Sequence, residues 1–245
     1  MRAFVVAKEK FKGAYDMAQI IDSRERRRIV GDMTISPVDI INQRRYPDTI
    51  SLARSNFDTH GYTVHDYFTI HHPDKTEKIA DTPYRALLPK GLDGIIVTGL
   101  GISAHRDAMP ILRMQACIQN QGYAMGVAAS MASQKDGHTR DIDIKKLQDH
   151  LVEKGSLPER VLTDEDTYPY SQEVLEQAVA SVANDYEGLG IILAQPQDAK
   201  PLIEKAYQTV LDLEREQEVQ ESSLIQLQDL SPEDIQSAKE LYAQI

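Results

Sequence analysis

The 245-residue sequence has very little cysteine, because Cys117 is the only one. A single cysteine cannot form a disulfide within the chain, and disulfides are features of oxidising compartments. A reducing compartment is therefore favoured, with the cytoplasm as the first choice. Apolar runs are also short, and none approaches the roughly 20 residues that a membrane-spanning helix needs. We expect the chain to have no part that lies in a membrane.

Positive charge is scarce as well. The sequence has 27 Lys and Arg residues against 38 Asp and Glu, which leaves a formal net charge of -11. An acidic chain gains nothing from the counterion release that drives binding to nucleic acids. The same charge disfavours an anionic membrane surface. We therefore expect no nucleic-acid or membrane partner, and a small molecule is the expected substrate.

The sequence also lacks a metal-binding pattern. His65, His71 and His72 lie near Asp66 and Asp74, but no spacing among these residues matches a zinc site. We interpret this stretch as a polar loop and predict no metal.

The pattern that is present indicates an α/β fold with a helical C-terminal part. Short strands and loops are predicted over residues 44–82, and a buried strand over 92–98 that leads into the turn Gly99-Leu100-Gly101. Ser36 has the features of a helix N-cap. Further strands are predicted over 18–21 and 27–35, and helices over 2–12, 114–132, 143–153, 171–184, 198–220 and 232–244.

The strongest functional signal is the strand, glycine turn and helix over residues 91–126. Ligands of open α/β sheets bind beyond the carboxyl ends of the strands, where glycines let the backbone approach closely. A helix N-terminus there offers N–H groups and partial positive charge. The alternative is an ordinary strand–turn–helix unit in an α/β core. Gly122, Gly126 and Ser130 recur every four residues, which predicts a helix face that packs closely against a neighbour.

Several blocks of the sequence occur in the order and spacing of a known family. They are Arg-Glu-Arg-Arg-Arg-Ile-Val-Gly-Asp at 24–32, Asp-Thr-His at 58–60, Pro-Tyr-Arg-Ala-Leu-Leu-Pro-Lys-Gly-Leu-Asp at 83–93, Ile-Ser-Ala at 102–104 and Arg-Met at 113–114. Together they resemble the C-terminal, flavin-contacting part of FAD-dependent oxidoreductases related to fumarate-reductase-type flavoproteins. The resemblance covers roughly residues 18–160.

This resemblance implies FAD as cofactor, and hydride transfer between the flavin and a small organic, sugar-like or hydroxylated substrate. Residues 1–160 would be the back half of a two-domain FAD-binding flavoprotein fold, with a mixed sheet and a flavin-facing strand, turn and helix. Residues 161–245 would form a helical region whose paired helices also suit a helical-repeat array. The predicted cofactor contacts are Gly99, Gly101, Ile102, Ser103, Arg113, Met114 and Gln115.

The sequence also departs from the family. Leu100 and Ala116 stand where the family often has Arg and Pro, and Leu100 cannot make the polar cofactor contact that the family's Arg implies. The family begins with a Gly-x-Gly-x-x-Gly turn that holds the ADP half of FAD, and none of the thirteen glycines has that spacing. We therefore expect the chain to begin in mid-domain and to bind FAD weakly by itself. Its expected partners are the missing N-terminal part or, through exposed sheet edges, a second copy.

Three residues are candidates for catalysis. His60 and His105 are each a candidate base for the proton of a substrate alcohol. Arg85 is a candidate for holding substrate oxygens. The plainer interpretations are a hydrogen-bonded loop histidine in the first two cases and a structural ion pair in the third.

Two other functions stay open at this point. A flavin-free remnant would bind another protein through its acidic C-terminal part, which has ten acidic and three basic residues from residue 201 onward. A Ser/His hydrolase would use Ser103 and His105, although the second glycine of Gly-x-Ser-x-Gly is absent.

Overall fold

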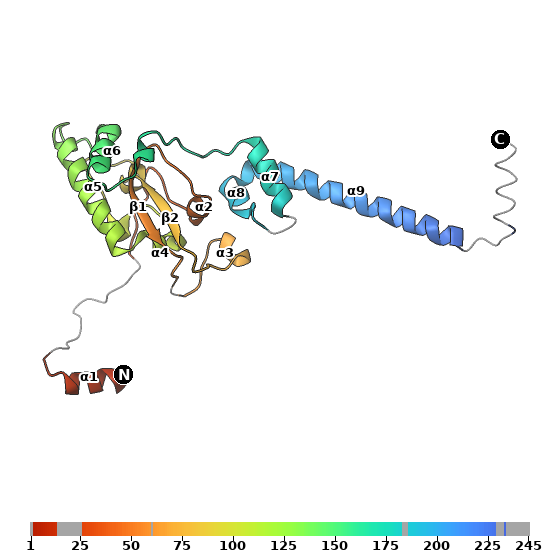
Figure 1. Ribbon diagram of the computed structural model, residues 1–245, viewed down its shortest axis with the longest axis horizontal. Helices are drawn as coiled ribbons and strands as arrows, with labels where there is room; N and C mark the ends of the chain where they lie inside the picture. The colour runs from red at the N-terminus through yellow and green to blue at the C-terminus, as the bar shows by residue number, and fades with distance from the viewer. Residues whose placement is uncertain (1, 14–25, 60, 183–185, 229–232, 234–245) are drawn as a thin grey trace. The chain divides into compact units, whose positions relative to one another are not determined.

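The computed structural model describes residues 2–13, 26–59, 61–182, 186–228 and 233 (Figure 1). The chain divides into two compact units, residues 1–168 and residues 169–245. The strand predicted over 18–21 lies outside the described residues. The helix predicted over 232–244 does so too, apart from Glu233.

The first unit contains a small antiparallel sheet of two strands, β1 (Thr49–Ser55) and β2 (Lys78–Pro83). The short helix α3 (Tyr67–Ile70) lies in the chain between them. These elements confirm the short strands and loops predicted over 44–82. Helices α4, α5 and α6 all contact β1, and Figure 1 shows them around the sheet. The unit is therefore a mixed α/β structure whose sheet, within the described residues, is smaller than expected.

The helices of the first unit begin at recognisable signals. Ser36 precedes α2, and its backbone N–H donates to Asp39 Oδ2 at 2.7 Å, which confirms the predicted helix start. Asp143 caps α6 by accepting from the N–H of Lys146. The bounds are α1 (Arg2–Lys10), α2 (Pro37–Ile41), α4 (Met109–Leu112), α5 (Gln115–Ser133) and α6 (Ile144–Glu153), with 3-10 turns η1 (Tyr84–Leu87), η2 (Gly99–Gly101), η3 (Arg106–Ala108) and η4 (Glu159–Leu162).

An extended segment over residues 29–35 runs between two other parts of the chain. It forms an antiparallel bridge from Gly31 to Pro89 and a parallel bridge from Ile35 to Ala104. Backbone hydrogen bonds hold it on both sides: Asp32 to Leu88, Lys90 to Val30, Ile29 to Gly101, Ile35 to Ser103 and His105 to Ile35, donors first. The β-prone stretch predicted over 27–35 is thus extended, although it forms isolated bridges rather than a regular strand.

The absence of a side chain at Gly31 allows the extended segment to pass between its two neighbours. A Cβ atom at Gly31 would lie 2.7 Å from the Cβ of Ser103 and 3.2 Å from the carbonyl oxygen of Arg85. Real Cβ atoms do not approach so closely, so the position requires glycine. Beside it, the hydroxyls of Ser103 and Thr34 lie 2.7 Å apart and form a hydrogen bond.

The prediction of a buried strand over 92–98 is wrong. The stretch has no strand assignment, and Ile95 is 47% exposed. Gly94 and Gly99 near its two ends adopt positive φ angles of 74° and 67°, which interrupt an extended backbone. The apolar run between them is too short to define a strand without a partner.

The closely packed glycine face predicted on α5 is also wrong. Gly122, Gly126 and Ser130 are exposed, and a Cβ atom at either glycine would meet nothing within 4 Å. The buried face has the same spacing of four but is offset by two residues. It consists of Cys117, Gln121, Ala124, Met125, Ala128 and Ala132. Both stripes contain small residues at the same period, so the sequence did not distinguish them.

A cluster of charged groups ties the end of the first unit to its sheet. The carboxylate of Asp81 on β2 accepts hydrogen bonds from Arg160 at 2.8 Å and from Arg45 at 3.2 Å. Arg44 binds Asp166 through two hydrogen bonds of 2.8 and 3.0 Å. Because the Asp81 side chain is only 2% exposed, these partners are needed to offset the loss of its hydration.

The second unit consists of α7 (Gln172–Val182), α8 (Leu189–Ala194) and the 33-residue α9 (Pro196–Gln228). Their small core contains Leu175, Ala178, Ile192 and Ala199. Helices are thus present where they were predicted over 171–184 and 198–220.

The packing at Gly31 and the exposure of Gly126 predict opposite effects of the same substitution. Gly31→Ala should destabilise the fold by about 1–3 kcal/mol, because the new methyl group overpacks a tight contact. Gly126→Ala should stabilise it by about 0.8–1 kcal/mol, since alanine favours an exposed helix interior over glycine. Urea unfolding followed by circular dichroism measures both, and equal effects would contradict the described packing.

Candidate functional site

The predicted cofactor turn, η2, is held by a buried glutamine of α5. The N–H of Gly99 donates to Oε1 of Gln121 at 3.1 Å. The Gln121 side chain is fully buried, and its Nε2 has no hydrogen-bond partner in the described part of the chain. A buried donor without an acceptor costs about 1–3 kcal/mol. Nε2 of Gln121 is therefore a donor beside the turn that an electron-rich group could satisfy.

The other predicted cofactor residues differ in accessibility. Ile102 is 0% and Ser103 1% exposed, so both side chains lie in the core. The Arg113 side chain is 10% exposed and donates to the carbonyl oxygen of Asp58 at 2.9 Å. Met114 is the N-cap of α5 and is partly buried, whereas Gln115 is exposed.

Gly101 completes this set. A Cβ atom there would lie 2.9 Å from Cγ1 of Val97, so the Val97 side chain packs closely against this glycine. The structure thus brings Gly99 and Gly101 together with the side of α5 at Gln121. Roles for all seven predicted residues in cofactor binding stay predictions.

Arg85 has the geometry of a structural ion pair, the plainer of its two interpretations. Its guanidinium donates two hydrogen bonds of 2.9 and 3.0 Å to Asp48, which also accepts from the Arg85 backbone N–H. The pKa of Arg85 is raised, chiefly by this hydrogen bond to Asp48. The arrangement is that of a structural ion pair, and Asp166 lies 3.7 Å away as a second partner.

His60 lies outside the described residues, whereas His105 forms a pair with His65. Their rings are 5.2 Å apart between centroids and nearly perpendicular. Nδ1 of His105 accepts from the N–H of Asp107 at 3.1 Å, and Nδ1 of His65 accepts from the N–H of Tyr67 at 3.2 Å. Each ring thus uses its Nδ1 lone pair locally and carries its proton on Nε2 when neutral.

The buried carboxylate of Asp107 fixes the pair. One oxygen accepts from the backbone N–H groups of Val64 and His65, both at 2.7 Å. Nε2 of His65 lies 3.3 Å from the hydroxyl of Ser36, the residue that caps α2. We define these four side chains, His65, His105, Asp107 and Ser36, as the histidine cluster.

The surroundings of both histidines favour the neutral imidazole. Partial burial lowers the pKa of His65 below its usual value of 6.5, and the neighbouring His105 lowers it further. Burial also lowers the pKa of His105 despite the opposing effect of Asp107. A neutral His105 with its proton on Nε2 is a hydrogen-bond donor there, and its predicted role as a base stays a prediction.

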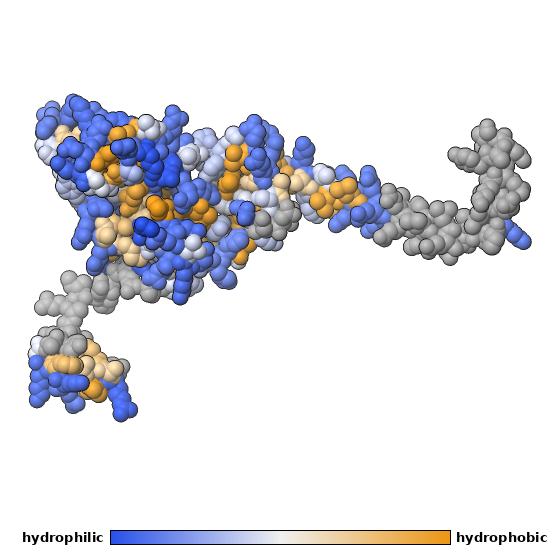
Figure 2. All heavy atoms as spheres, viewed as in Figure 1, coloured by the Kyte–Doolittle hydropathy of each residue, from blue (hydrophilic) through white to orange (hydrophobic). Residues whose placement is uncertain are grey.

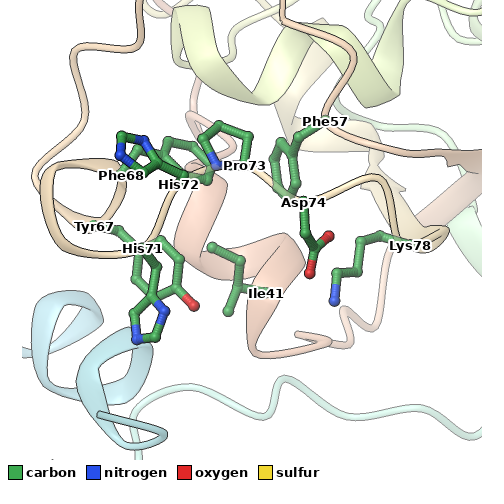
Figure 3. Close-up of a pocket in the computed structure, with 9 residues that line it drawn as sticks. All are labelled: Ile41, Phe57, Tyr67, Phe68, His71, His72, Pro73, Asp74 and Lys78. Atoms are coloured by element: carbon green, nitrogen blue, oxygen red, sulfur yellow. The ribbon is translucent and has the colours of Figure 1, made fainter.

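A cavity of about 70 Å³ lies beside α3, and Tyr67 and Phe68 of that helix line it (Figure 3). Tyr67 and His71 stack at 5.3 Å on one side, and Asp74 and Lys78 lie on the opposite side with Ile41 between. This volume holds about two water molecules, so the cavity fits a small substituent and not a flavin. A larger, open cavity of about 440 Å³ lies along the glycine side of α5 and next to Ile96.

Sequence reasoning missed His65, Asp107 and Gln121. His65 was assigned to a polar loop, since nothing in its neighbourhood indicated that it meets His105, forty residues later in the chain. Gln121 carried no signal beyond its position on a predicted helix. In the described residues, no three His, Cys, Asp or Glu side chains gather as a metal site.

The sheet, the glycine turn and the adjoining helix define a mixed α/β domain. The family model for FAD dependent oxidoreductases matches residues 2–151. The match spans more than half of the chain, so the chain belongs to this family of flavoproteins, whose cofactor is FAD. No curated protein and no solved structure matches the chain. In the described part of the chain, no helix has the length and apolarity to span a membrane.

The lowered pKa values predict how stability depends on pH. The folded state binds fewer protons at His65 and His105 than the unfolded state, so stability is highest above pH 6.5 and falls as the pH drops from 6.5 through their lower folded-state pKa values. In His65→Gln/His105→Gln, the fall in unfolding free energy between pH 7.5 and pH 5 should be shallower than in wild type. Urea titrations at several pH values measure it.

His150→Gln is the matched control, because its imidazole bonds to Tyr123 away from the cluster. It should keep the wild-type pH dependence. An unchanged slope in the double variant would show that the two histidines do not titrate as described.

Proposed function

We propose that this chain forms the substrate side of an FAD-dependent oxidoreductase that transfers a hydride between the flavin and a small hydroxylated organic substrate. The family match over residues 2–151 carries this proposal. When bound, FAD supplies the electron sink. The chain supplies position, hydrogen bonds and exclusion of water.

Flavin contacts are assigned to the backbone at Gly99 and Gly101, to Nε2 of Gln121 and to the start of α5 at Met114 and Gln115. Two observations support the fit. Gln121 has a buried donor without a partner in the described residues, and the N-terminal N–H groups of a helix favour an electron-rich group. Arg113 would hold the start of α5 in place through its hydrogen bond to the carbonyl oxygen of Asp58. Ile102 and Ser103 would fix the turn by packing in the core beneath it.

His105 would act on the substrate oxygen. Nδ1 of His105 accepts a hydrogen bond from the backbone N–H of Asp107, so the Nε2–H is the group left to donate. A hydrogen bond from a neutral imidazole stabilises negative charge that develops on an alcohol or carbonyl oxygen during hydride transfer. His65 and Asp107 would be positioning residues, since they hold the ring and its tautomer.

The alternatives receive less support. Ser103 is 1% exposed and bonds to Thr34, an arrangement that does not suit attack on an ester. A protein-binding role of the acidic helical region is compatible with the oxidoreductase assignment. A reducing compartment stays a prediction from the single cysteine.

The absence of a Gly-x-Gly-x-x-Gly turn from the 245 residues predicts weak FAD binding by this chain alone. Flavin fluorescence titration should show no submicromolar binding. A version with such a segment added, in the same chain or co-expressed, should bind FAD and turn yellow. Stoichiometric submicromolar binding by the 245-residue chain would contradict this and reveal a different ADP site.

In the FAD-binding version, Gln121→Leu should weaken flavin binding measurably more than Gln119→Leu, which changes an exposed residue of the same helix. His105→Gln should lower kcat by about 10²–10³-fold, as removal of one donor to a developing oxyanion does. His150→Gln should leave kcat unchanged. Equal kcat in the His105 and His150 variants would remove His105 from the proposed site.

A further inference from the structure

One wall of the open cavity beside α5 is a short loop over residues 93–96, which we call the cavity loop. Gly94 and Ile96 of this loop line the cavity, and α5 contributes most of the other lining residues, including Ala132. Ile95 is 47% exposed, and hydrophobic residues reach the surface of the first unit in several places (Figure 2). Among the described residues, no hydrogen bond between main-chain groups holds residues 93–96. The position of this wall therefore depends on side chains.

The carboxylate of Asp93 fastens the cavity loop to the turn that follows α5. Its Oδ2 lies 2.7 Å from Nδ1 of His138, and its Oδ1 accepts from the N–H and the hydroxyl of Thr139 at 3.0 and 2.8 Å. The turn itself is anchored, because the hydroxyl of the buried Tyr84 donates to the carbonyl oxygen of Thr139 at 2.8 Å. Asp93 thus links the loop to a fixed part of the fold.

Both ends of the cavity loop are held by bonds that do not change near neutral pH. Arg140 donates to the carbonyl oxygen of Leu92, just before the loop. The N–H of Val97, just after it, donates to the carbonyl oxygen of Leu87 at 2.9 Å. Arg140 keeps its charge, because its pKa is raised, chiefly by its hydrogen bond to Asp32. The part that can move is therefore limited to the cavity loop.

The contact between Asp93 and His138 does depend on pH. The pKa of His138 is raised above its usual value of 6.5, chiefly by the hydrogen bond to Asp93, and Asp141 and Asp136 on the same turn raise it further. The same bond holds the pKa of Asp93 well below its usual range, so this carboxylate stays ionised. Tyr84 stays neutral, because burial raises its pKa to about 12. His138 is therefore the group of this contact whose charge changes near neutral pH.

The sign of the effect follows from the raised pKa. A charged donor makes a stronger hydrogen bond to a carboxylate than a neutral donor does. The contact is therefore strongest below pH 6.5 and weakens as the pH rises through the raised pKa of His138. The side chains of His138 and Asp93 are 58% and 36% exposed, so water screens the pair and its effect is local rather than global.

We propose that Asp93 and His138 form a pH-dependent latch that holds the cavity loop against the turn after α5 and thereby controls access to the cavity. The latch is closed while His138 is protonated. When His138 loses its proton, the loop loosens, Ile96 moves away from α5, and the cavity opens toward Ala132, which is 3% exposed in the closed form. The latch does not require flavin binding.

Hydrogen exchange of the Thr139 amide in the full-length chain tests the latch, because this N–H donates to Asp93. Its protection factor, which is corrected for the intrinsic effect of pH on exchange, should fall at least about threefold between pH 6 and pH 8.5 when measured by NMR. In His138→Gln the protection factor should be the same at both pH values. His72→Gln changes an exposed histidine at the other cavity and should keep the wild-type fall.

Thiol labelling tests access to the cavity. Ala132→Cys places a thiol at a buried position of the cavity lining, and Ser133→Cys places one at an exposed position. The ratio of the first labelling rate to the second removes the pH dependence of thiol ionisation, and mass spectrometry distinguishes both sites from Cys117. This ratio should rise at least about threefold between pH 6 and pH 8.5. With His138→Gln added to each variant, the ratio should not change with pH.

The outcomes separate the parts of the proposal. A constant protection factor of Thr139 in the wild type would overturn the latch, and so would an equal fall in His138→Gln. Exchange that responds to pH without any change in the labelling ratio would overturn control of the cavity. In Asp93→Asn, an NMR titration should show the pKa of His138 moving toward 6.5, and an unchanged pKa would show that the two groups do not interact. Circular dichroism checks that each variant remains folded.

Discussion

The fold of the first unit depends on the passage of residues 29–35 between the segments 85–90 and 101–105. Backbone hydrogen bonds hold this extended stretch on both sides. The passage requires a residue without a side chain at Gly31, where a Cβ atom would overlap Ser103. Because three distant parts of the chain meet here, the contact joins the sheet side of the domain to the glycine turn.

The same passage positions the histidine cluster. The backbone N–H of His105 donates to the carbonyl oxygen of Ile35 at 2.7 Å, and the next residue, Ser36, reaches His65 while it precedes α2. Asp107 then ties the loop before α3 to the turn that follows His105. The two histidines are therefore held by backbone contacts on several elements, which suits a site that must keep one tautomer.

Local signals in the sequence predicted the parts of the fold that depend on neighbouring residues. The helix start at Ser36 and helix α5 are examples, because capping and helical period are local. The stretch 92–98 failed, since a buried strand needs partners that a local pattern cannot supply. The contact of His65 with His105 is similarly set by tertiary structure. The family's order of motifs placed the glycine turn and the start of α5 among the cofactor contacts, and these roles stay predictions.

Hydrogen exchange of the backbone amides measured by NMR tests the central passage most directly. The amides of Ile29, Ile35 and His105 should exchange with free energies of opening close to that of global unfolding, because each bond breaks only when the segments separate. The amide of Ile95, a residue that is 47% exposed and has no strand assignment, should exchange far faster. Rapid exchange at Ile35 and His105 under native conditions would contradict the passage and, with it, the described position of the histidine cluster.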